Sequence, residues 1–204
     1  MTRLEPTAHQ GGVKSPQHPL PAGTAWRAVG RCAISTVVLL RHRRVHLPRG
    51  HVGLGLRFAD GTSARVYRET TVDRPPAADP CVLVVRFRLR AVRGRGHALF
   101  RWESLFNTPL FVGFPGLISK LWLTADERGN YRGLYEWDGP GRAEAYARAL
   151  WRVLALVSVP GSIAYQVLPG LTRQPVLADP RPNSGTSTGS ATLREDWWRV
   201  LEVA

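Results

Sequence analysis

Two alternating, aromatic-rich segments in the middle of the chain constrain the fold more than any other part of the sequence. Pro115-Gly116 is a turn signal, and residues 117–124 behind it alternate as a β-strand does. A polar turn over residues 126–130 leads into a second alternating run at 131–137. A loop of this length between two such runs predicts a β-hairpin.

Alternation divides the side chains of this hairpin between the two faces of a sheet, because successive residues of a strand point to opposite sides. The expected sets are Leu117, Leu121 and Leu123 against Ile118, Lys120 and Trp122 in the first strand, and Tyr131, Gly133, Tyr135 and Trp137 together in the second.

The segments around the hairpin complete a regular order. A helix follows at once, since Pro140 suits a first helical turn and apolar residues recur at helical spacing from Tyr146 to Val157. The remaining expected elements are a strand at 81–90, a helix at 94–107 ended by Pro109, and a last strand at 162–168. This βαββαβ order predicts an α+β, ferredoxin-like fold.

The same stretch carries a spaced motif. Pro-Gly is followed by three residues, Lys, one further residue and Trp. Gly-x-Tyr-x-aromatic and an Ala-x-Ala-Tyr helix come next. The residues are Pro115, Gly116, Lys120, Trp122, Gly133, Tyr135, Trp137, Ala143, Ala145 and Tyr146. Over residues 81–170 the chain resembles the YdhR-like mono-oxygenase family of the dimeric α+β barrel superfamily.

The fold leaves one question of assembly open. Two helices cover one face of such a sheet, and the other face is bare. In the superfamily that the chain resembles a second copy covers it, which implies a homodimer. The alternative cover is the N-terminal hairpin of the same chain, which would give a pseudo-barrel monomer.

The flanking segments have different compositions. Residues 1–25 are polar and Pro-rich and predict a disordered leader. Residues 26–73 predict an extension with a β-hairpin at Asp60-Gly61, and with a short helix whose end, from Ile34 on, also suits a buried strand. Residues 171–204 predict a flexible linker and then, from 193 on, a short amphipathic helix.

The net charge of +13 is concentrated in the first half of the chain. Residues 1–100 hold 17 Lys/Arg and 5 Asp/Glu, whereas residues 101–204 hold 11 and 10. The run Arg41-His42-Arg43-Arg44 suits either an anion-binding patch or a solvated helix end. No nucleic-acid-binding motif accompanies it, so we expect an exposed helix end and no specific nucleic-acid partner.

The cysteines and apolar runs bear on the compartment. Cys32 and Cys81 form neither a disulfide framework nor a metal motif, which favours two reduced thiols in a cytoplasmic protein. Residues 1–25 lack a secretory pattern, and the apolar runs are far shorter than the ~20 residues of a membrane span. We therefore expect no membrane partner.

The candidate site lies on the hairpin. If the rings of Trp122, Tyr135 and Trp137 face the barrel interior, they form an apolar ligand site, and Gly133 leaves room for a planar compound. Burial would lower the pKa of Lys120 and make it a proton acceptor. Arg86 is the second expected cation, so the ligand-binding set is Trp122, Tyr135, Trp137 and Arg86. The alternative is that these rings bind no ligand and only pack in the hydrophobic core and at the dimer interface.

His97 is the second catalytic candidate, as a general base at a cavity mouth; the alternative is a surface histidine at the start of a helix. Superfamily relatives oxidise electron-rich aromatics without a cofactor, so the resemblance implies no cofactor; the sequence shows no metal-ligand motif, so we expect no metal. The leading hypothesis is thus a small-molecule-binding barrel that acts as a cofactor-independent mono-oxygenase on an aromatic or polyketide-like compound. The alternative is a non-catalytic dimeric binding or assembly protein.

Overall fold

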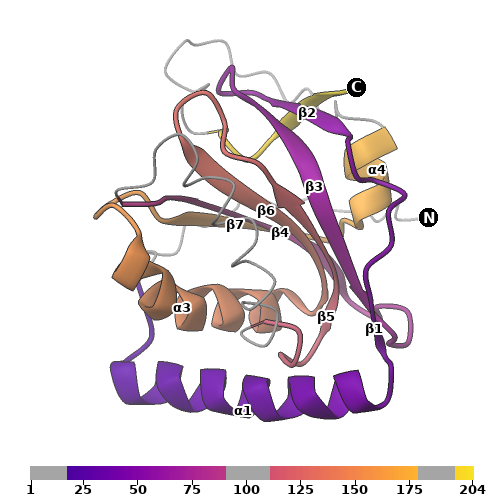
Figure 1. Ribbon diagram of the computed structural model, residues 1–204, viewed down its shortest axis with the longest axis vertical. Coiled ribbons are helices and arrows are strands. Elements are labelled where there is room, and N and C mark those ends of the chain that lie inside the picture. Colours follow the sequence, from indigo (N-terminus) through magenta and orange to yellow (C-terminus); the bar gives the residue numbers. More distant parts are fainter. Residues whose placement is uncertain (1–17, 91–110, 179–195) are drawn as a thin grey trace, which may run out of the picture.

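The computed structural model describes residues 18–90, 111–178 and 196–204 (Figure 1). Its elements are α1 (Ala22–Arg41), β1 (Val45–His46), β2 (Gly55–Phe58), β3 (Ser63–Val72), β4 (Pro80–Arg88), β5 (Leu117–Leu123), β6 (Asn130–Asp138), α3 (Pro140–Val157), β7 (Ala164–Pro169), α4 (Arg173–Ala178) and β8 (Val200–Val203). The expected helix at 94–107, and His97 with it, lies outside the described residues.

The central four strands have the ferredoxin-like arrangement. In space they run β7-β4-β6-β5, so the first strand in sequence, β4, lies between the fourth and the third. All the pairings are antiparallel, and β4 pairs with β6 along its whole length, from Pro80 opposite Asp138 to Arg88 opposite Asn130. The predicted α+β, ferredoxin-like fold is confirmed.

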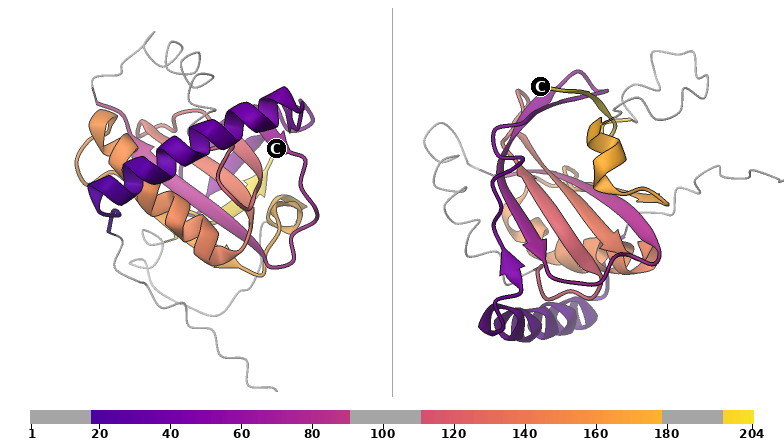
Figure 2. Two further views of the ribbon diagram at one scale, coloured as in Figure 1. Left: turned by 90° about the horizontal axis from the view of Figure 1, so that it is seen from below. Right: turned by 90° about the vertical axis from the view of Figure 1, so that its right-hand side faces the viewer.

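The sheet continues past β5 with strands from both ends of the chain. β3 pairs with the free edge of β5, β2 pairs with β3, and β8 pairs with β2, while β1 adds two residues to the far end of β3. The sheet curls, so that β2, β3 and β8 face back over the central strands (Figure 2). The chain therefore covers the sheet face for which a second copy was expected.

Two apolar cores lie on opposite faces of the sheet. The first core lies between the sheet and α3 and includes Leu83, Tyr135 and Trp137 of the strands and Tyr146 of α3. The second core fills the concave face, where Val176 of α4, Trp197 and Val200 pack on β2 to β6. α1 lies across the outside of α3, which makes it the outermost layer (Figures 1 and 2).

Local chemistry explains the turns of this fold. Asp126 organises the predicted turn of the central hairpin, because its Oδ1 accepts hydrogen bonds from the backbone N–H of Arg128 and Asn130. Gly129 in that turn and Gly61 in the Asp60-Gly61 hairpin have φ of +77° and +80°, the left-handed region that favours glycine. Pro140 begins α3, where the missing N–H costs no hydrogen bond.

The structure corrects four expectations. α1 begins at Ala22, inside the expected leader, and residues 173–178 of the expected linker form α4. Residues 200–203 form β8, not a helix, because β2 offers its open edge to their backbone. Leu117 joins the first core while Leu121 and Leu123 join the second, since the β5–β6 register shifts between Leu117 and Ser119.

The orientation of α1 differs in part from the apolar pattern of its sequence, in which Trp26, Val29, Cys32, Ala33, Val37 and Leu40 would share one face. A helix is present over residues 26–40 as expected, and a strand from Ile34 is excluded. Its inward stripe is Ala25, Val29, Cys32 and Thr36, spaced by four, three and four residues. Trp26 and Val37 point outward instead.

Candidate functional site

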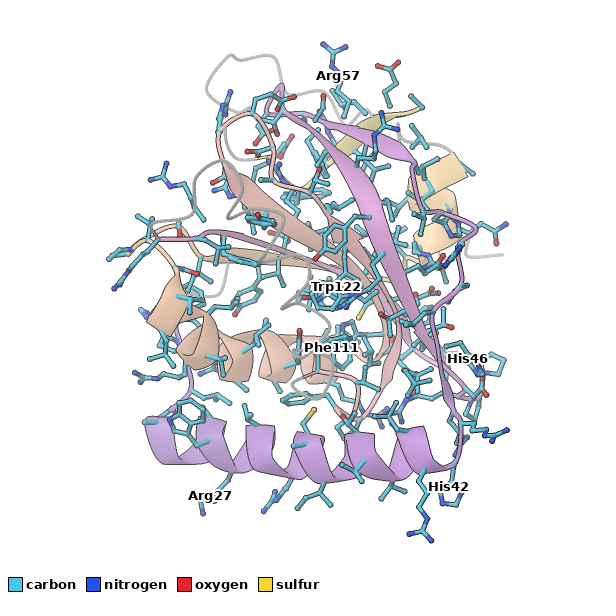
Figure 3. All side chains as sticks on the ribbon, in the orientation of Figure 1. Arg27, His42, His46, Arg57, Phe111 and Trp122 are labelled. Carbon is cyan, nitrogen blue, oxygen red and sulfur yellow. The ribbon has the colours of Figure 1, made fainter. Side chains whose placement is uncertain are left out.

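Lys120 is the central residue of the site. Its side chain leaves β5 toward the first core, and the residue is only 5% exposed. The Nζ atom lies 3.1 Å from the ring centroid of Trp122, 4.4 Å from that of Phe111 and 4.6 Å from that of Tyr135. Figure 3 shows Trp122 and Phe111 in the layer between the sheet and the helices. The amine is thus surrounded by aromatic rings.

Strand register brings these groups together. Lys120 of β5 stands opposite Tyr135 of β6, and Trp122 stands two residues further along the same face. On the other edge of β5, β3 places Thr70 opposite Lys120 and Arg68 opposite Trp122. Three adjacent strands therefore contribute to one patch on the helix-covered face.

Burial dominates the electrostatics of Lys120. Desolvation lowers the pKa of its amine well below the ordinary value of 10.5, and the neighbouring Arg68 guanidinium lowers it further. In the described part of the chain no carboxylate lies within ion-pair distance of Nζ. Burial therefore favours the uncharged form of the amine, which is the form that can accept a proton.

Arg68 and Thr70 hold Trp122 from β3. The Arg68 guanidinium carbon lies 3.9 Å from the centroid of the Trp122 ring, and the indole Nε1 donates to Thr70 Oγ1 at 3.2 Å. Burial lowers the pKa of Arg68, although an arginine remains charged. Phe111 packs edge-on against the same indole, at 5.0 Å between ring centroids. These contacts fix the ring that Lys120 faces.

Tyr135 closes the other side of the cluster. The hydroxyl of Tyr146 on α3 donates to the Tyr135 hydroxyl over 3.2 Å, and burial raises the pKa of both phenols. The expected room beside Gly133 is occupied, because a Cβ added there would lie 2.7 Å from Cε2 of Tyr135. Gly133 thus admits the neighbouring tyrosine ring rather than a ligand.

The other expected ligand-binding residues lie apart from Lys120. Trp137 belongs to the same core but lies two residues after Tyr135, toward the end of β6. Its ring packs against that of Tyr146, at 4.9 Å between ring centroids. Arg86 lies on the opposite face of the sheet, so it cannot share a ligand with Lys120: its guanidinium carbon is 4.5 Å from the Trp197 ring of the second core. The expectation of a joint Lys120 and Arg86 site is wrong.

Arg86 takes part in a separate buried ion network. Arg132 donates to Asp60 and Asp126, each at 2.6 Å, and Arg86 lies 3.9 Å from Asp60. The Arg132 side chain is fully buried, and its single positive charge is paired with one carboxylate from each of two turns. This network joins the turn between β2 and β3 to that between β5 and β6, which is a structural role.

Three residues of the site were missed by sequence reasoning: Arg68, Thr70 and Phe111. Arg68 and Thr70 belong to β3, and the pairing of β3 with the edge of β5 has no local signal in the sequence. Phe111 precedes the Pro-Gly turn and could have been included as an apolar residue next to a spaced aromatic motif.

No protein-family model and no curated protein sequence matches the chain. A ferredoxin-fold protein related to antibiotic biosynthesis monooxygenases, from Listeria monocytogenes, is 14% identical with a TM-score of 0.40, over 55% of this chain and 66% of that one. An anthrone oxidase-like protein is 15% identical with a TM-score of 0.35, over 54% and 55%. The chain spans less than two thirds of the length of either. Likenesses this distant carry no argument about the site.

The helices of the described segments include none whose length and apolar character would allow it to cross a membrane.

Proposed function

We propose that the protein binds a small, acidic aromatic compound against the Lys120 cluster, with the Lys120 amine as acceptor of the compound's proton. The observation that carries this proposal is the burial of the amine among three aromatic rings, with no carboxylate of the described residues beside it. An apolar lining with one convergent polar group is the usual composition of a small-ligand site.

Proton transfer explains why such a cluster would select an acid. The uncharged amine of Lys120 takes the phenol or enol proton, and an ammonium–phenolate pair replaces two neutral groups. The faces of the Trp122, Phe111 and Tyr135 rings attract the new cation, and the anion stays next to it. Burial strengthens this attraction, because water is excluded from the pair.

As the specific form of this function we propose a cofactor-independent mono-oxygenase of the YdhR-like kind, acting on an aromatic or polyketide-like compound. The bound anion reacts with molecular oxygen at a ring methylene. That carbon becomes a carbonyl, one oxygen atom is retained, and the other leaves as water. Lys120 holds the proton that the substrate gives up, and it returns a proton to the leaving oxygen.

One observation favours the non-catalytic alternative. The ring of Tyr135 occupies the space beside Gly133, and Trp197 and Val176 fill the concave face of the sheet. A barrel filled by its own side chains suits a binding or assembly protein. Turnover distinguishes the two. Oxygen consumption with a bound phenol whose keto form carries a ring methylene supports the enzyme, whereas binding without oxygen consumption supports the alternative.

The deciding experiment replaces Lys120 by methionine, which keeps the length of the side chain and removes the amine. With a naphthol as probe, we expect the parent protein to bind and to shift the absorption of the naphthol to that of the naphtholate. Lys120→Met should bind about 10–100 times more weakly, as expected for a lost charge-assisted hydrogen bond, and without the spectral shift.

The control is Arg57→Met, which removes an exposed cation of β2, a strand that lies two strands away from the Lys120 strand β5. It should bind the naphthol as the parent does. Equal binding by the parent and by Lys120→Met, with both proteins folded, would rule out the proposed site.

A further inference from the structure

The outer face of α1 exposes a row of apolar side chains. Ile34 is 69% exposed and Val37 is 63% exposed, and Trp26, Val38 and Leu40 are each about half exposed. Ile34 and Val38 lie opposite the stripe that packs toward α3, and Val37, Trp26 and Leu40 lie on its flank. No described part of the chain covers these side chains fully. Exposed apolar side chains gathered on one part of a monomer surface mark an interaction site.

Basic residues lie among these apolar side chains on the outer face of α1, and acidic residues are absent from it. Arg27, Arg31 and Arg41 are exposed on α1, and Arg43 and Arg44 follow at its end. The sequence contains no Asp or Glu from residue 6 to residue 59. Among the ion pairs of the described residues, none involves these five arginines. The outer face of α1 is therefore apolar and uniformly positive.

The helix is placed to meet a flat surface. It is the outermost layer of the molecule, with Arg27 and His42 labelled along its outer side (Figures 1 and 3). Its 20 residues make a cylinder about 30 Å long. An exposed helix with apolar and basic residues, including a tryptophan, has the composition of helices that lie in a membrane interface.

We propose that α1 binds an anionic lipid surface, lying in the plane of the interface with Trp26, Ile34 and Val37 among the acyl chains and its arginines at the headgroups. The charges disfavour a second copy of the same face, since two uniformly positive helices repel each other. The helix face also measures only about 30 Å by 10 Å, roughly 300 Å², against the ~800 Å² per partner of a stable protein interface.

A lipid surface meets both requirements. Each arginine near an anionic leaflet adds attraction, and each inserted apolar side chain leaves water. An interfacial helix needs no spanning length, so the proposal agrees with the absence of a spanning helix from the described residues. It differs from the expectation, drawn from short apolar runs, that the protein has no membrane partner. Nucleic acid would use the arginines but gain nothing from the apolar row.

The test is sedimentation of the full chain with vesicles of phosphatidylcholine, with and without phosphatidylserine. We expect binding to the anionic vesicles only, weakening as salt is raised. The double change Ile34→Ser and Val37→Ser should weaken binding at least tenfold, and Arg27→Gln and Arg31→Gln should each weaken it about fivefold.

Matched controls lie at the other side of the molecule. Leu201→Ser removes an exposed apolar side chain of β8, and Arg57→Gln removes an exposed cation of β2, which Figure 3 shows opposite α1. Both should bind as the parent does.

Three results would overturn the proposal. They are equal binding to neutral vesicles, no loss on removing Ile34 and Val37 in a folded protein, and a dimer in light scattering that the Ile34→Ser and Val37→Ser change dissociates. The last result would assign the face to a second copy.

Discussion

Burial rather than hydrogen bonding sets the chemistry of Lys120 at the scale of single residues. Its neighbours are the ring faces of Trp122, Phe111 and Tyr135 and the guanidinium of Arg68, and no carboxylate of the described residues lies within ion-pair distance of its amine. A protonated Lys120 is therefore costly in the folded state. This cost should be measurable without any ligand.

The first residue-scale prediction concerns pH. The folded-state pKa of Lys120 lies below the unfolded value of 10.5, so between these two values the unfolded chain binds more protons than the folded one. The Lys120 contribution to stability must then rise with pH through this window, by at most about 1.4 kcal/mol per unit. At neutral pH the buried amine therefore destabilises the folded parent. Lys120→Met has no such amine and should be the more stable protein at that pH.

Urea titrations of both proteins at several pH values test this. The series stays below pH 9.0, the ordinary pKa of a thiol, because burial raises the pKa of Cys32 and Cys81 above that value and their titration would add to the pH dependence of stability at higher pH. The stability advantage of Lys120→Met should shrink as pH rises. A constant difference would show that Lys120 is protonated in the folded protein.

Contacts between elements depend on close backbone approaches as much as on apolar faces. Gly113, in the segment before β5, lies directly against α1: a Cβ there would be 2.0 Å from the carbonyl oxygen of Cys32 and 2.7 Å from the backbone nitrogen of Thr36. Both neighbours are backbone atoms within a helix and cannot move aside alone. This contact fixes α1 against the first core.

The element-scale prediction compares two glycine substitutions. Gly113→Ala should lower the free energy of unfolding by about 1–3 kcal/mol or more, because the added methyl group forces α1 away. Gly30→Ala is the control, since a Cβ at Gly30 meets nothing within 4 Å and a helix interior favours alanine by about 0.5–1 kcal/mol. It should stabilise the protein. Equal effects in chemical denaturation would contradict the close packing of α1.

The whole molecule buries its concave sheet face with its own segments. β2, β3 and β8 extend the sheet past β5, and Trp197 and Val176 complete the second core. An uncovered face was the reason to expect a homodimer, and that reason no longer applies.

The prediction at this scale is a monomer. Light scattering at micromolar concentration should give a mass near 22.6 kDa, and the unfolding midpoint should not depend on protein concentration. Trp197→Ala should destabilise the monomer by about 3 kcal/mol, since it empties a large volume of the second core. A species of twice the monomer mass would restore the dimeric barrel.

Local pattern was enough to predict part of the site. Alternation along one hairpin places Lys120, Trp122 and Tyr135 on one face, and the structure brings these three together. Arg86 could not be placed in the same way, because its face depends on the register of β4 against β6. There Arg86 stands opposite Arg132, whereas Leu83 stands opposite Tyr135. An odd separation along the strand puts Leu83 and Arg86 on opposite sides.

The sequence by itself determined the elements whose signals are local. The turn residues, the period of two in β5 and β6 and the helical period of α3 predict the ferredoxin-like order without tertiary information. Only the tertiary structure decided how the flanks are used. Residues 200–203 alternate too briefly to specify a state, and they become a strand because β2 offers backbone partners and the concave face buries Val200. β3 likewise joins β5 across more than 40 residues of chain, where long-range pairing leaves no local pattern in the sequence.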